Sequence, residues 1–185
     1  MPSLYFDDPD EGLAPATSHP AFVQFAREAF WWDGADDFSP FGSDDGHDTL
    51  SSLVDWYREG GHGASAPVMP FLQQLLADWD FPVPADLLDR DDAAKAAWLQ
   101  QDAMNDSYLA SVCRARVATA FGQIKVSGRL DPEVREQALS ALHTLLWLNE
   151  RARSQFPDWP HADEDAQALR SMQAVLAQRT PSLAS

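Results

Sequence analysis

The sequence has a single cysteine and no long hydrophobic run. Cys113 alone excludes an intramolecular disulfide and a cysteine-based zinc site within one chain. The longest apolar runs, such as residues 145–148, are far shorter than the roughly 20 residues that span a bilayer. The N-terminal residues also lack a basic and then apolar signal pattern. These absences predict a cytoplasmic protein that encodes neither an export signal nor a membrane anchor.

Familiar catalytic motifs are missing as well. The sequence contains no glycine-rich phosphate loop, no nucleophile elbow and no dinucleotide fingerprint. Its histidines are scattered, without the i, i+4 pair that marks many zinc hydrolases. Cys113 lies on the apolar stripe of an expected core helix, which favours a buried, inert thiol over a nucleophile. We therefore expect no catalytic residue, no cofactor and no metal site, and an enzyme is less favoured than a binding protein.

Positive charge is scarce in the first half of the chain. The formal net charge is −16. Residues 1–48 hold eleven acids against one arginine, residues 49–102 hold nine against three basic residues, and residues 103–185 hold nine of each sign. The electrostatic field of this excess negative charge repels nucleic acid and attracts cationic protein surfaces. A basic protein partner is thus favoured over nucleic acid or a membrane, although a solvated face that only maintains solubility is an alternative.

Hydrophobic periodicity predicts an all-α, single-domain bundle of about six to eight helices. The clearest pattern covers residues 106–126, with Gly128 placed as a C-terminal cap, and a second helix follows over residues 131–153. The short connection makes these two a central antiparallel hairpin. Further helices are expected from Pro20 to before Asp33, and over residues 45–59, 67–79, 91–102 and 163–178. Residues 1–18 read as an irregular acidic lead-in, 19–179 as the helical domain, and 180–185 as a flexible tail.

An acidic loop over residues 33–46 separates the first two expected helices. Its clustered carboxylates could supply oxygen ligands to calcium or magnesium. The EF-hand spacing fails, because Gly46 in the sixth position would place Phe41 in the first. Helix capping by Asp45, with Asp44 and Asp48 at the positive helix end, is the structural alternative.

Large aromatic residues share this neighbourhood with the carboxylates. Packing in the core is the usual fate of such residues, and the alternative is an aromatic anchor ringed by charges, as in protein-interface hot spots. On the second interpretation, the predicted partner-binding residues are Trp31, Trp32, Asp36, Asp37, Phe38, Phe41, Asp44, Asp45, His47 and Asp48.

Three segments resemble a known family. They are SHPAF at residues 18–22, DDFSPFGSDDGHDTLSSLVDWYREGG at residues 36–61, and AFGQIKVSGRLDPEVREQALSAL at residues 120–142. Together they are similar to the uncharacterised bacterial YfeS family. The resemblance implies a cytoplasmic bacterial protein of unassigned activity, and it carries over no catalytic residues.

The favoured hypothesis is a non-enzymatic protein-binding protein. Acidic asymmetry, small size and absent catalytic motifs suggest an immunity-type inhibitor that masks a cationic site of a partner toxin. One alternative is a metal-dependent hydrolase that uses the aspartates of the acidic loop. Another is a regulatory or scaffolding module.

Overall fold

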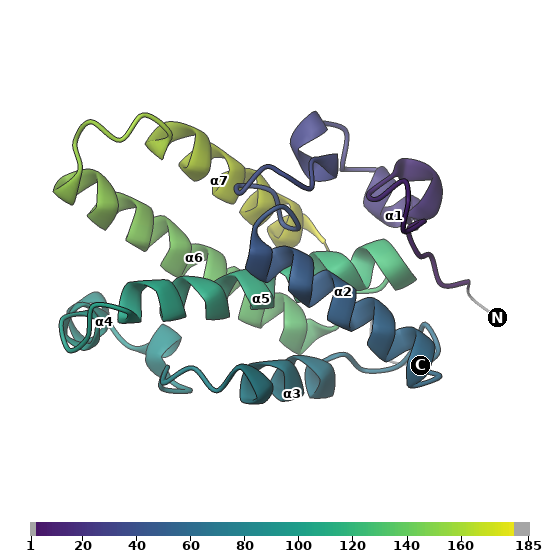
Figure 1. Cartoon of the computed structure of the whole chain (residues 1–185), viewed down its shortest axis with the longest axis horizontal. Coiled ribbons are helices and arrows are strands. Elements are labelled where there is room, and N and C mark those ends of the chain that lie inside the picture. The colour runs from purple at the N-terminus through teal and green to yellow at the C-terminus, as the bar shows by residue number, and fades with distance from the viewer. Residues whose placement is uncertain (1–2, 180–185) are drawn as a thin grey trace.

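A computed structural model describes residues 3–179 and shows an all-α protein (Figure 1). Within this range there are seven α-helices and no strand, so the predicted fold class is confirmed. The helices are α1 (Pro20–Val23), α2 (Asp44–Glu59), α3 (Met69–Trp79), α4 (Asp92–Leu99), α5 (Asn105–Ser127), α6 (Pro132–Gln155) and α7 (Ala162–Gln178). Three short 3-10 helices cover Pro15–Thr17, Ala29–Trp32 and Leu87–Asp89. The expected tail at 180–185 lies outside the described residues.

The predicted hairpin of α5 and α6 forms the centre of the molecule. Gly128 ends α5 in the left-handed conformation at φ 72°, and its N–H donates to the Ile124 carbonyl at 2.9 Å. The Asp131 N–H at the start of α6 donates to the Gln123 side chain at 2.9 Å. Most of α5 is buried, because neighbouring elements surround it.

The other helices cover this hairpin. In Figure 1, α2 crosses α5, α7 lies along α6, and α3 lies on the opposite side of α5 from α7. Gly122 allows α2 to approach closely, because a Cβ there would come within 2.8 Å of the Leu53 side chain. No helix among residues 3–179 is both long enough and apolar enough to cross a membrane.

The single helix expected from Pro20 to before Asp33 is instead two short pieces, which corrects the prediction. α1 ends at Val23, Glu28 adopts an extended conformation, and a 3-10 helix follows. This break lets Phe22 meet the edges of Trp31 and Trp32, with ring centroids 6.1 and 5.4 Å apart. The aromatic residues therefore form a compact cluster rather than the stripe of one helix.

The lead-in and the N-cap of α1 pack on the C-terminal end of α5. The Tyr5 N–H donates to the Val126 carbonyl at 2.9 Å, and the His19 N–H donates to the Lys125 carbonyl at 2.8 Å. Carbonyls at a helix end have no intrahelical partner, so these bonds satisfy acceptors that would otherwise be unpaired.

Candidate binding site at the acidic loop

Small residues allow the acidic loop to fold tightly onto the start of α2. A Cβ at Gly42 would lie 2.0 Å from the Asp36 carbonyl oxygen, and one at Gly46 would lie 2.5 Å from that of Pro40. The Ser39 hydroxyl donates to the Asp33 carbonyl at 2.9 Å. The FSPFGSDDGHDTL string therefore contains the residues that this close packing requires.

The cap of α2 differs from the expected one. Ser43, and not Asp45, is the N-cap, and its hydroxyl accepts from the Gly46 N–H at 3.2 Å. Asp44 and Asp45 lie in the first turn, where the positive helix end stabilises carboxylates. Asp45 is half-buried, and its Oδ2 is 3.5 Å from Arg114 Nη1 on α5.

Two of the predicted partner-binding aromatics lie in the core. Trp31 is 3% exposed and Phe41 is 1% exposed, so the core-packing interpretation describes both. Trp32 is half-buried, and its indole N–H donates to the Ala26 carbonyl at 2.8 Å. Phe38 is also half-buried and lines a cavity. Of the four aromatic residues predicted to bind a partner, only Phe38 and Trp32 are therefore partly accessible at the surface.

The carboxylates are mostly on the surface. Asp37, Asp44 and Asp48 are exposed, as is His47, whereas Asp36 is half-buried and accepts from the Phe38 N–H at 2.9 Å. None of the three exposed aspartates makes an ion pair with a residue in the range 3–179. They are therefore free to contact a partner.

The exposed face of α2 extends this acidic character. Asp55 and Glu59 are exposed and follow Asp44 and Asp48 at helical spacing, so all four lie on one face. We call Asp37, Asp44, Asp48, Asp55 and Glu59 the acidic surface.

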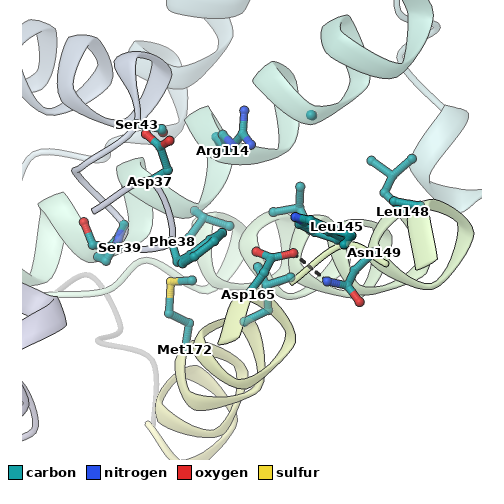
Figure 2. A pocket seen from close by; sticks show the side chains of 16 residues that line it. Asp37, Phe38, Ser39, Ser43, Arg114, Leu145, Leu148, Asn149, Asp165 and Met172 are labelled. Atoms are coloured by element: carbon teal, nitrogen blue, oxygen red, sulfur yellow. Dashed lines mark hydrogen bonds between the residues drawn. The ribbon is translucent and has the colours of Figure 1, made fainter. Parts of the chain in front are cut away.

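A cavity of about 180 Å³ lies between the loop and helices α5, α6 and α7 (Figure 2). Phe38, Leu145, Leu148 and Met172 are among its apolar lining residues. The space is comparable to an engineered cavity of about 150 Å³ that accommodates benzene. It can therefore hold a small apolar group or an amino-acid side chain.

A polar cluster lines one side of the cavity. Buried Asn149 donates through Nδ2 to Asp165 Oδ2 at 2.7 Å and to the Ala162 carbonyl at 3.0 Å, and its Oδ1 accepts from Arg153 at 3.0 Å. Figure 2 shows the Asp165 carboxylate between Asn149 and Phe38. Burial raises the pKa of Asp165, and the Asn149 hydrogen bond and the charges of Arg114 and Arg153 only partly offset this effect. Its carboxylate is consequently a desolvated negative group that a cation would stabilise.

Sequence reasoning missed Arg114, Asn149 and Asp165. All three occur on helices whose apolar spacing was the dominant pattern. One signal could have pointed to Asn149: it directly follows the apolar run at residues 145–148 on an expected core helix, and a polar residue at such a buried position needs hydrogen-bond partners.

Support for metal or thiol chemistry is lacking in the described part of the chain. No group of three or more histidine, cysteine, aspartate or glutamate side chains in residues 3–179 is arranged to hold a metal ion. Burial raises the pKa of the Cys113 thiol to about 12, so the thiolate is scarcely populated near neutral pH.

Comparison with known proteins finds a similar curated protein, which is itself uncharacterised. The chain is similar to the uncharacterised protein YfeS of Escherichia coli K12, with 30% identity over 142 residues. This match confirms the resemblance indicated by the sequence segments. It covers 77% of the chain but 56% of YfeS, so the chain spans just over half the length of this curated relative. No protein-family model matches the sequence, and no solved structure matches it.

Proposed function

We propose that this is a non-enzymatic binding protein whose acidic surface and adjoining cavity bind a basic protein. Two adjoining features support the proposal. Exposed aspartates of the acidic surface make no ion pair with any residue in the range 3–179, and the cavity beside them is lined by the half-buried Asp165. Net charge of −16 steers a basic partner to this face during diffusion.

The cavity provides a specific contact for one side chain of the partner, in addition to the long-range electrostatic attraction. A lysine or arginine side chain of the partner places its aliphatic stem along Phe38, Leu145 and Met172 and its charged head near Asp165. Asp37 adds a second carboxylate to the cavity lining. Such a buried, charge-matched anchor has the character of an interface hot spot.

The finer form of the proposal is an immunity-type inhibitor. Binding at the acidic surface covers cationic residues of the partner, and a toxin that uses those residues to bind an anionic substrate is thereby inhibited. A regulatory or scaffolding role would use the same surface, but without inhibiting a toxin.

Affinity capture from the native cell extract tests the proposal. The wild-type protein should retain a basic protein that the variant Asp37→Asn/Asp44→Asn/Asp48→Asn loses. A matched variant, Glu133→Gln/Glu136→Gln/Glu150→Gln, removes the same charge from exposed positions on α6 and should retain the partner. The absence of any basic protein in the capture, or equal loss by both triple variants, would contradict the proposal.

A further inference from the structure

A second pocket contains a positive charge that no residue in the range 3–179 neutralises by contact. It has a volume of about 370 Å³ and lies between α3, the segment at residues 81–85 and α5, with one contribution from α6. Its apolar walls include Leu72, Leu76, Phe81 and Val83. This volume falls within the range of ligand pockets, about 300 to 1,000 Å³.

Arg116 is the one charged residue that lines this pocket. Its guanidinium makes no hydrogen bond or ion pair with the described residues, and its Nε is buried without an acceptor. Of the three guanidinium nitrogens, only Nε is both fully buried and without a hydrogen bond. Because the two Nη nitrogens also make no hydrogen bond within residues 3–179, they must be accessible to solvent or to a ligand. Burial lowers the pKa of Arg116, and the electrostatic effects of Cys113 and Asp89 only partly offset this, but arginine stays protonated near neutral pH.

The surroundings of Arg116 are unusual for so acidic a protein. Although the chain carries 29 aspartates and glutamates, none of them lines the pocket. Gln73 and Gln137 are the uncharged polar residues of its lining. Asp89 acts on Arg116 through its charge but makes no ion pair with it. A buried charged donor without an acceptor is costly, and a bound anion would supply the acceptor.

We infer that this pocket binds an amphipathic monocarboxylate, with the carboxylate on Arg116 and the alkyl or aryl group against Leu72, Leu76, Phe81 and Val83. The planar guanidinium can donate two parallel N–H bonds to one carboxylate. A single arginine and an acidic protein disfavour a multiply charged phosphate ligand. The site is separate from the acidic surface and does not depend on the function proposed for it.

Calorimetric titration of the full chain with octanoate, 1-octanol and octylamine tests the inference. Octanoate should bind with one-to-one stoichiometry, and the other two probes should bind about tenfold more weakly or not at all, because the probes share an apolar chain and differ in head-group charge. Arg116→Met keeps an apolar stem and should weaken octanoate binding by about tenfold or more, which corresponds to about 1.4 kcal/mol. Arg116→Lys should be intermediate, because lysine lacks the guanidinium fork.

Arg114→Met is the matched control, because Arg114 lies on the same helix but lines the other cavity. It should bind octanoate like the wild-type protein, and in the wild type octanoate should shift the Nε–Hε NMR signal of Arg116. Equal binding of octanoate and 1-octanol, undiminished binding by Arg116→Met, or no octanoate binding up to about 10 mM would overturn the inference.

Discussion

The ammonium group of Lys125 lies 2.7 Å from Asp7 Oδ1 and 2.8 Å from the Ser18 hydroxyl, and its side chain is 1% exposed. Thr17 donates to the same Asp7 oxygen at 2.6 Å. Burial lowers the pKa of Lys125, whereas the hydrogen bond and charge of Asp7 raise it, and burial is the larger effect. A residue of the acidic lead-in thus neutralises a cation inside the helical bundle.

Removing Asp7 should therefore destabilise the protein. Asp7→Ala leaves the buried ammonium without its counter-ion and should lower the free energy of unfolding by about 3 kcal/mol or more. The double variant Asp7→Ala/Lys125→Met should lose less, because no buried charge is left unpaired. Asp10→Ala, at an exposed position, is the control. Urea denaturation measures all four proteins, and an Asp7→Ala variant as stable as the control would contradict the role assigned to this pair.

Ser43 and Asp45 should differ in their effect on stability. Ser43→Ala removes the cap of α2 and should lower the free energy of unfolding by about 1 kcal/mol. Asp45→Asn loses a 3.5 Å contact to a partly exposed arginine and should change stability by less than about 0.5 kcal/mol. Thermal unfolding followed by circular dichroism distinguishes the two. A larger loss for Asp45→Asn than for Ser43→Ala would contradict this assignment and would show that the charge of Asp45 matters more than the cap, because asparagine caps as well as aspartate does.

Cys113 should make stability fall at alkaline pH. Its pKa is about 12 in the folded protein against an ordinary value of 9.0, so between these values the unfolded chain binds fewer protons than the folded one. The free energy of unfolding then decreases by up to about 1.4 kcal/mol per pH unit. Cys113→Ala should remove this contribution. Denaturation curves of both proteins from about pH 8 to about pH 10 test it, and parallel pH dependences would contradict it.

Asp165→Asn should make the protein more stable at neutral pH. Asparagine can still accept from Asn149, while the cost of the desolvated charge disappears. Because burial raises the pKa of Asp165 above the ordinary value of 3.8, that cost exists at pH values above 3.8 and vanishes as the pH falls below it. The variant should thus gain stability relative to wild type at neutral pH and lose this gain in acid. A relative loss at neutral pH would show that its interactions with Arg114 and Arg153 outweigh burial.

The sequence predicts the central helices well because local signals agree there. The apolar spacing of α5 ends at a glycine, and Pro132 opens α6. The same spacing misled at α1, where Phe22, Phe25 and Phe30 fit a helix but pack instead as a cluster across a break. Propensity could not reveal this, because tertiary contacts between aromatic rings decide it.

The carboxylates of the acidic loop were identified from the sequence, but the cavity was not. Asp37 and Asp165 line the same space although they are far apart in the chain. Their proximity depends on how α7 packs against α6 and how the loop folds over α5, which no local pattern encodes. For the same reason, the sequence could not predict that Arg116 lacks a hydrogen-bond acceptor, because this depends on the positions of all its neighbours in the folded chain.

The association rate with a captured basic partner, measured over a range of salt concentrations, tests the central claim most directly. The wild-type rate constant should fall by about tenfold or more between about 50 and about 500 mM salt, because charges are screened beyond about 10 Å at 0.1 M. The dissociation rate should change less. Asp37→Asn/Asp44→Asn/Asp48→Asn should associate slowly at low salt and show a weaker salt dependence, whereas the α6 triple variant should behave like wild type. An association rate that is independent of salt and equal in all three proteins would contradict binding through the acidic surface.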